Sequence, residues 1–320
     1  MSTLIEQAAE RLEQLRRSGA VLPTSLGMSV PAPAFSGAAT ADVVAQTRPE
    51  AATSASRPVV PASRRVELDL DALAAAGYVT PNSPRTRTAD QFRVVKRPLI
   101  RNAMGDGKEG TAHSNLIMVT SALAGEGKSF TAVNLAMSIA TELDHTVMLV
   151  DADVARPSVL RILGLPSGPG LLDLLDDSSD MSNVLLRTNV DKLTVLPSGT
   201  PHARATELLA SEAMRQLLDD MASRYPDRII IFDSPPLLLT TESRALATNM
   251  GQIVVVVQAG RTLQSDVQHA LATIESCPVK MMLLNQVRVD ERSAYGYGYG
   301  YGAGYGYGYG NRQDHEPSEA

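Results

Sequence analysis

The chain has 320 residues and a net charge of −6, and 44% of its residues are hydrophobic, which allows one large α/β domain with extensions or two small domains. The single cysteine, Cys277, excludes an internal disulfide framework and a cysteine-based zinc site. Residues 1–100 carry 12 Lys and Arg against 9 Asp and Glu, whereas residues 101–320 carry 17 against 26, and no dense basic block suggests nucleic acid as a partner.

The N-terminal residues and the apolar runs bear on localisation. No apolar run approaches the roughly 20 residues of a membrane-spanning helix. The first 19 residues lack the apolar segment of a signal peptide. We therefore expect a cytoplasmic protein.

Residues 1–63 divide into two segments. Within residues 1–18, apolar residues recur at helical spacing and predict an amphipathic helix, which either docks on its own domain or binds a partner or a membrane surface. Residues 19–63 are rich in Ala, Pro, Ser and Thr and predict a disordered linker. The short apolar stretch 68–78 is expected to be tied down on the domain that follows.

Residues 64–290 predict a globular α/β domain. Helix-like stretches at 129–144, 207–224, 242–249 and 265–275 lie between most of its β-rich runs. The runs are continuously apolar rather than alternating, as expected for strands buried on both faces of a mostly parallel sheet with helices on both sides. The predicted strands cover 116–120, 147–150, 193–196, 229–232, 253–257 and 281–284.

A phosphate-binding loop follows the first predicted strand. Residues 121–129 read SALAGEGKS and lead directly into a predicted helix, which is the strand–loop–helix context of a P-loop. Glycine backbone N–H groups would cradle phosphate oxygens, Lys128 would reach the β- and γ-phosphates, and the Ser129 hydroxyl would bind Mg²⁺. Ala122 replaces the usual first glycine, and an ordinary glycine-rich turn is the weaker alternative.

Carboxylates stand at the ends of two further strands, in Asp151-Ala152-Asp153 and at Asp233. The carboxyl ends of parallel strands are where open α/β sheets bind ligands. A single aspartate at such a position is better explained by capping of the next helix. Three beside a P-loop favour a nucleotide and metal site.

The C-terminal segment 291–320 contains the repeat YGYGYGYGAGYGYGYG at 295–310. Seven of the chain's 13 aromatic residues lie there, so they cannot contribute to the core. The glycines maximise chain entropy and predict a disordered tail. Sixteen extended residues would reach on the order of 50 Å, far enough to enter a neighbour's site.

These motifs together resemble the bacterial tyrosine kinases, P-loop enzymes related to MinD and ParA. The similar motifs are the loop at 125–136, DADVARP at 151–157 and IIIFDSPP at 229–236. Residues 68–99 are similar to the tyrosine autokinases of exosortase and exopolysaccharide clusters. The resemblance implies an ATP-dependent kinase that phosphorylates its C-terminal tyrosines in trans and regulates exopolysaccharide biosynthesis. The acceptors would be Tyr295, Tyr297, Tyr299, Tyr301, Tyr305, Tyr307 and Tyr309.

The resemblance also implies roles for individual residues. Asp151 becomes the base that takes the tyrosine proton, with Lys128 and Asp153 as the other catalytic residues. Ser129, Asp153 and Asp233 would bind Mg²⁺, and Asn285 would read adenine, although it is almost as well explained as a polar strand end. The predicted ATP contacts are Gly125, Glu126, Gly127, Lys128, Ser129, Phe130 and Asn285.

Two family motifs match only in part. Ala155 stands where the arginine of the D-x-D-x-R motif would be. Asp90, Arg93 and Lys96 match the ring-forming E-x-x-R-x-x-R helix conservatively, which suggests a homo-oligomer. Further partners implied by the resemblance are a membrane chain-length determinant (a polysaccharide co-polymerase), which would hold the protein at the inner membrane, and a tyrosine phosphatase.

Two other functions compete with the kinase. A MinD/ParA-type positioning ATPase is the first, but such proteins carry an extra lysine where Leu123 stands and have no tyrosine cluster. The second is a non-catalytic scaffold whose Tyr-Gly tail acts as an adhesive or spacer. A scaffold leaves Lys128, Ser129 and the three aspartates unexplained.

Overall fold

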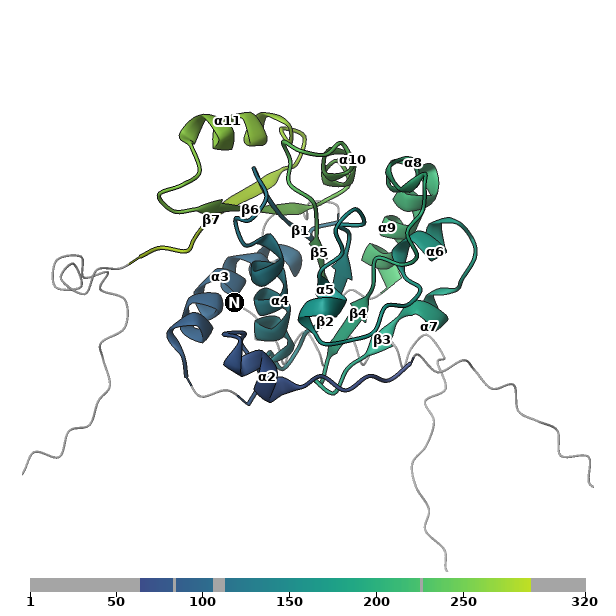
Figure 1. Cartoon of the computed structure of the whole chain (residues 1–320), viewed down its shortest axis with the longest axis horizontal. Helices are drawn as coiled ribbons and strands as arrows, with labels where there is room; N and C mark the ends of the chain where they lie inside the picture. The colour runs from purple at the N-terminus through teal and green to yellow at the C-terminus, as the bar shows by residue number, and fades with distance from the viewer. Residues whose placement is uncertain (1–63, 83–84, 106–112, 225–226, 289–320) are drawn as a thin grey trace, which may run out of the picture. The chain divides into compact units, whose positions relative to one another are not determined.

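In the computed structural model, the described residues are 64–82, 85–105, 113–224 and 227–288, and they lie in one compact unit, Arg57–Ala320. The predicted helix at 1–18, the linker and the tyrosine tail lie outside them. Figure 1 shows the elements, which are α2 (Leu70–Ala75), α3 (Arg87–Ala103), β1 (Leu116–Ser121), α4 (Lys128–Ala140), β2 (Thr146–Asp151), α5 (Val159–Ile162), α6 (Leu171–Leu175), α7 (Met181–Val184), β3 (Leu186–Arg187), β4 (Leu193–Leu196), α8 (Ala205–Leu209), α9 (Glu212–Arg224), β5 (Arg228–Asp233), α10 (Glu242–Ala247), β6 (Gln252–Gln258), α11 (Gln264–Ala272) and β7 (Val279–Asn285).

The strands form one seven-stranded sheet in the order β3-β4-β2-β5-β1-β6-β7. Every pair is parallel except β3 with β4, so the predicted P-loop NTPase-like fold is confirmed. The central strands β1, β2 and β5 are almost wholly buried, because successive residues point into two separate cores. Ile117 and Ile231 belong to the core beneath α3 and α4, whereas Met118 and Phe232 belong to the core that α9 covers.

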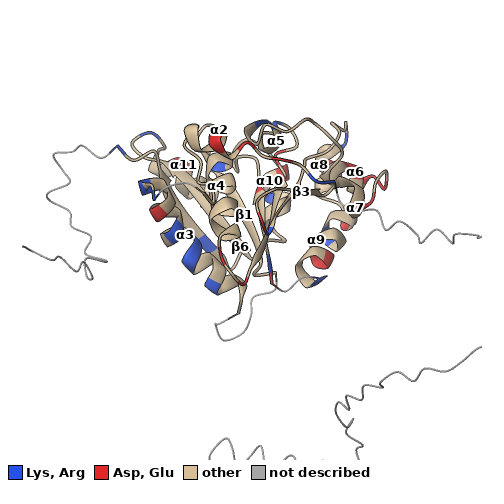
Figure 2. Ribbon diagram, turned by 90° about the horizontal axis from the view of Figure 1, so that it is seen from below, with Lys and Arg blue, Asp and Glu red and all other residues tan. Residues whose placement is uncertain are grey.

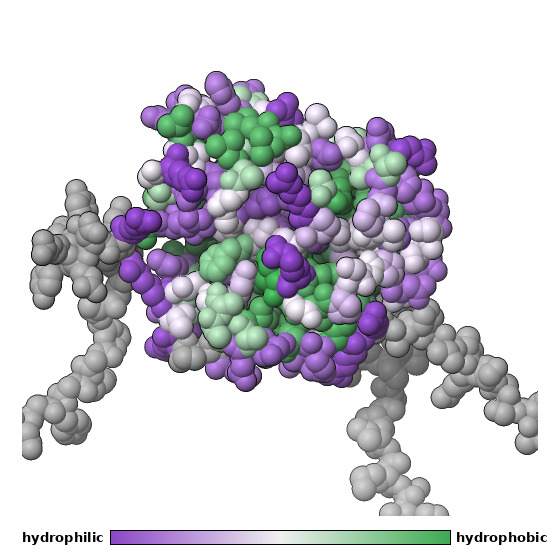
Figure 3. Space-filling view, in the orientation of Figure 1, coloured by the Kyte–Doolittle hydropathy of each residue, from purple (hydrophilic) through white to green (hydrophobic). Residues whose placement is uncertain are grey.

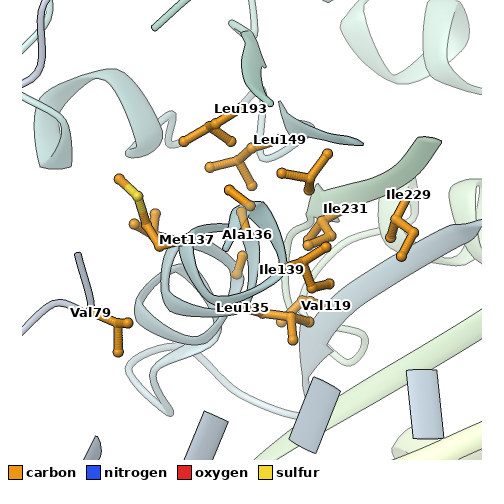
Figure 4. Close-up of a cluster of buried hydrophobic side chains, with 14 of the residues drawn as sticks. Val79, Val119, Leu135, Ala136, Met137, Ile139, Leu149, Leu193, Ile229 and Ile231 are labelled. Carbon is orange, nitrogen blue, oxygen red and sulfur yellow. The ribbon is translucent and has the colours of Figure 1, made fainter. Parts of the chain in front are cut away.

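Helix α4 lies against the middle of the sheet (Figure 4). Leu135, Met137 and Ile139 are fully buried there. Because α4 starts at the P-loop, this packing fixes the direction in which the helix N-terminus points. The segment before α3 is also tied down as expected, since Val79 N donates to the Asn134 Oδ1 atom of α4 at 2.7 Å.

Three sequence predictions are wrong in detail. The helix predicted to reach residue 144 ends at Ala140, where Lys96 donates to Ser138 O in its last turn and Lys192 donates to Leu143 O just beyond it. The helix predicted over 207–224 is two helices, because Ser211 Oγ accepts from Met214 N at 3.2 Å and starts α9 anew. Strand β7 was expected to be buried on both faces, but it is an edge strand that leaves Met282 and Leu284 exposed.

Helix α3 carries the three residues that match the ring-forming motif, and Figure 2 shows basic residues along it. Asp90 and Arg93 are exposed and pair with each other at 2.8 Å. Lys96 is only 3% exposed and pairs with Glu142 at 2.8 Å, and it also donates to Ser138 O at the end of α4. The charge of Lys96 therefore joins α3 to α4 inside one chain and is not presented to a neighbour.

Replacing Lys96 by Met should lower the free energy of unfolding by about 2 kcal/mol, because Glu142 and the α4 carbonyls lose a largely buried cation. The hydrogen bond from Lys96 also holds the pKa of Glu142 below its usual range. The loss should therefore be present at pH 7 and shrink as Glu142 is protonated in acid. Denaturant unfolding at pH 7 and pH 4 measures it. The exposed control Arg93→Met should cost less than about 0.5 kcal/mol.

Candidate active site

The P-loop connects β1 to α4 and is shaped by two glycines. Gly125 and Gly127 have φ angles of +85° and +97°, in the left-handed region that side chains disfavour. A Cβ atom on Gly127 would also lie 2.1 Å from Asn285 Nδ2. Gly127 is the N-cap of α4, so the loop presents backbone N–H groups and a helix N-terminus to an anion.

The Glu126 side chain braces this loop from within. It is 1% exposed, and its Oε2 accepts from Leu123 N at 2.6 Å. Its Oε1 accepts from Gln258 N at 3.3 Å and from the Thr262 hydroxyl. The carboxylate is thus occupied by protein groups, which leaves the backbone N–H as the part of Glu126 that would contact a nucleotide.

Asn285, the last residue of β7, and Gln286, which follows it, lie over the same loop. Asn285 Nδ2 donates to Glu126 O at 2.9 Å, and Gln286 Nε2 donates to Gly125 O at 3.4 Å. The P-loop is therefore held by the ends of β6 and β7 as well as by its own strand. The amide of Asn285 lies beside the loop, and reading of adenine by Asn285 stays a prediction.

Lys128 is the first residue of α4 and points to the aspartates at the end of β2. Its Nζ lies 2.7 Å from Asp153 Oδ2, and both side chains are largely buried. The other Asp153 oxygen accepts from Arg156 N at 3.2 Å. This ion pair places the predicted phosphate-binding lysine directly beside a predicted metal ligand.

Asp151 and Asp233 end the adjacent strands β2 and β5 and are paired in register. Asp151 Oδ2 accepts from Ser158 N and Val159 N at 3.0 and 2.9 Å and so caps α5. Asp151 Oδ1 and Asp233 Oδ1 are buried without a hydrogen-bond partner. One oxygen of Asp151 therefore caps a helix while the other has no partner, and its role as the base stays a prediction.

Burial raises the pKa of both carboxyl groups. The pKa of Asp151 is raised to about 7, chiefly by burial and next by the charge of Asp233, against the lowering effect of the α5 N–H groups. The pKa of Asp233 is raised to about 6, again chiefly by burial, while Lys128 and a hydrogen bond from Ser129 lower it. A carboxylate with a pKa near 7 is suited to accept a proton at neutral pH.

These residues also fit Mg²⁺. The described residues contain no group of three His, Cys, Asp or Glu that would enclose a metal by itself. Mg²⁺ in phosphate sites needs only one or two protein oxygens, because phosphates and water supply the other ligands. The Ser129 hydroxyl beside Asp233, whose Oδ1 has no partner, provides such a set.

An aromatic cluster stands next to the site. The Phe130 ring packs against Tyr78 and Phe92, with centroids 5.1 and 6.4 Å apart, so this predicted ATP contact faces α3 and the segment that follows α2. Tyr78 was not predicted as a site residue. Burial raises the pKa of Tyr78 above its usual value, while the charge of Arg161 lowers it and the charge of Asp233 raises it.

Sequence motifs could not have indicated Tyr78, because it lies 50 positions before Lys128 and its neighbours form no nucleotide motif. Ser158 was missed for a similar reason. The Ser158 hydroxyl donates to Asp233 Oδ2 at 3.4 Å. Ser158 lies five positions after Asp153, outside the sequence motifs that indicate the site. By contrast, Lys128, Ser129, Asp151, Asp153 and Asp233 lie together, as the ends of neighbouring parallel strands require. The seven predicted acceptor tyrosines lie outside the described residues.

A mostly parallel sheet whose first strand leads through a glycine loop to a lysine, with aspartates ending the adjacent strands β5 and β2, defines a P-loop NTPase-like protein. The AAA-domain family model named AAA_31 matches residues 114–286. Tyrosine-protein kinase YwqD of Bacillus subtilis is 31% identical over 215 residues, which cover 67% of this chain and 87% of YwqD. The chain belongs to the bacterial tyrosine kinases of this family, and it is a protein-tyrosine kinase by class.

Two further similarities differ in coverage. Tyrosine-protein kinase Ptk of Acinetobacter johnsonii is 33% identical over 188 residues, which are 58% of this chain but only 25% of Ptk. The crystal structure of the VpsO kinase domain is similar with a TM-score of 0.54 and 25% identity, over 62% of this chain and 96% of that domain. The chain therefore matches nearly all of a solved kinase domain and about a quarter of Ptk.

Proposed function

We propose that this kinase transfers the γ-phosphoryl group of ATP, with Mg²⁺, to tyrosines of its own C-terminal repeat, and that the transfer occurs between copies. The observation that carries the proposal is the group of Lys128, Asp151, Asp153 and Asp233 at the end of the P-loop. The relatives named tyrosine-protein kinases support it, and so does a tail in which the chain's own tyrosines are concentrated.

The residues divide the reaction among them. The P-loop N–H groups and Lys128 hold the phosphates and stabilise the charge that gathers on the β–γ bridging oxygen. Asp151 Oδ1 takes the proton of the tyrosine hydroxyl while the phenolic oxygen bonds to the γ-phosphorus. The bond from that phosphorus to the bridging oxygen breaks, and ADP leaves. Bound Mg²⁺, held by Ser129 and Asp233 with Asp153 beside them, would neutralise phosphate charge.

The cellular setting follows from the family resemblance. The kinase would act in exopolysaccharide biosynthesis and assemble as a homo-oligomer. A tyrosine phosphatase would remove the phosphates that it adds. No helix within the described ranges is both long and apolar enough to cross a bilayer. The resemblance further implies attachment to the inner membrane through a membrane chain-length determinant whose cytoplasmic segment activates the kinase.

Mixing two variants tests the proposal. A chain ending at Arg292 keeps the site without acceptors, and the full-length Lys128→Met variant keeps the acceptors without the lysine. We expect Mg-ATP to place phosphotyrosine on the Lys128→Met tail only when the shortened chain is present. The mixture is also tested with the cytoplasmic segment of the membrane partner. Absence of label in both mixtures, when the unmodified chain is labelled, would exclude transfer between copies.

A further inference from the structure

An apolar groove runs along the outer edge of the sheet. It lies between α3 and β7, has a volume of about 940 Å³ and is open to solvent. Phe92 and Val95 from α3, Phe130 from α4, and Met281 and Leu283 from β7 line it. The recess is visible at the left of Figure 3, where Figure 1 places β7 and α3.

The exposed apolar side chains of the protein gather at this groove. Seven large hydrophobic residues among those described are exposed, and four of them line it. They are Val94, Met282, Leu284 and Val287, which are 52% to 73% exposed. An apolar patch of this kind marks a surface that something covers.

The groove also offers unpaired backbone groups. Strand β7 pairs with β6 on one side, and within the described part of the chain no strand pairs with its other side. An open edge of this kind accepts an extended peptide as an additional strand, with pockets for alternate side chains. The occupant that fits is therefore extended and presents apolar rings on one face.

We propose that the occupant is the Tyr-Gly repeat 295–310 of the same chain. In a strand, successive side chains point to opposite faces, so this repeat would place its seven tyrosines and Ala303 on one face and only glycines on the other. The tyrosine face would lie against Phe92, Phe130 and Val94, and the glycine face would face water. The repeat carries no charge, which suits an apolar groove.

The course of the chain after β7 points to the same occupant. Gln286 has a φ angle of +58°, and the chain bends there. Val287 then lines the groove, so the chain leaves β7 along the surface that the tail would fill. Residues 289–294 separate the described chain from Tyr295, and six residues can reach at most about 20 Å, nearly the length of β7. A linker this short gives the tail an effective concentration in the millimolar range.

This inference rests on the proposed function, because the docked tyrosines are the proposed phosphate acceptors. A phosphate carries about −1.5 to −2 charges and loses its water on entering an apolar groove. The groove thus holds the unphosphorylated tail, and phosphorylation releases it. Docking itself requires neither ATP nor catalysis, so the two proposals fail separately.

Hydrogen exchange of the phosphatase-treated protein without ATP tests docking. With an affinity of about 0.1 mM at millimolar effective concentration, exchange over β7 should be about tenfold slower in the full chain than in the chain ending at Arg292. Replacing the seven tyrosines by Phe should keep the protection of β7 while removing the proposed phosphate acceptors. Replacing them by Ser should abolish the protection as well. Val94→Glu should remove the protection, and Leu263→Glu, an exposed residue outside the groove, should not.

Two results would overturn the inference. Equal exchange over β7 in the full and shortened chains would show that the tail does not dock there. Protection that grows with protein concentration would assign the groove to the tail of a second copy. Phosphotyrosine formed on adding Mg-ATP to the same samples reports separately on the proposed kinase reaction.

Discussion

Replacing Lys128 by Met should slow tyrosine phosphorylation at least about 10³-fold, because a single preorganised cation on the transferred phosphates contributes that much to phosphoryl transfer. Lys128 Nζ lies 2.7 Å from Asp153 Oδ2, so the lysine is directed to the carboxyl ends of the strands. The rate of phosphotyrosine formation on a separate acceptor chain, at saturating ATP, measures the loss.

Lys192→Met is the matched control for this experiment. Lys192 donates to Glu142 O and Leu143 O after α4, away from the P-loop. Its replacement should change the rate less than about twofold, as expected for a surface residue outside the site. A Lys128→Met variant that keeps a third or more of the parent rate would contradict the assigned role of the lysine.

Replacing Asp151 by Asn should lower kcat about 10²- to 10⁴-fold and should at the same time stabilise the unliganded protein at pH 8. The amide retains an oxygen that accepts from the α5 N–H groups but cannot take a proton. The carboxyl group has its pKa raised to about 7 in the folded chain against an ordinary value of 3.8. The folded state therefore binds a proton between about pH 4 and 7 that the unfolded state has lost.

The sign of the pH effect follows from that difference. The stability of the parent protein falls as the pH rises through this interval, because the buried group becomes charged. The Asn variant avoids this loss, so its Tm should exceed that of the parent by about 3 °C or more at pH 8 and by less at pH 4. Asp173→Asn, which weakens bonds to Gly170 N and Thr200 N outside the site, should instead lower the Tm. Equal kcat values for Asp151→Asn and the parent would exclude the base.

The sheet and the centre of the site could be predicted because both depend on short stretches of sequence. Continuous apolar runs identify strands buried on both faces, and the carboxyl ends of parallel strands meet at one edge. Asp151 and Asp233 are adjacent for this reason although 82 positions separate them. The glycines of the P-loop signal backbone conformations, which need no knowledge of the surrounding fold.

The interactions that support the site could not be predicted, because each joins distant segments through a single side chain. Glu126 in a phosphate loop indicates a nucleotide contact, but its carboxylate is bound by Gln258 and Thr262. Lys96 in a helix with alternating charges indicates a surface, but it is buried against α4. The exposure of Met282 and Leu284 in β7 could not be predicted either, because the apolar run of this edge strand resembles that of a central strand.

The two borders of the sheet differ in a way that limits self-association. At one border the two-residue strand β3 is followed by a single bridge between Arg65 and Arg187, with Val66 N donating to Arg187 O at 2.8 Å. At the other border β7 offers seven residues. Growth of a filament by strand pairing between molecules needs two free sheet edges on each molecule. With one of them blunted, a contact through β7 could join at most two molecules, so the described sheet cannot extend edge to edge into a filament.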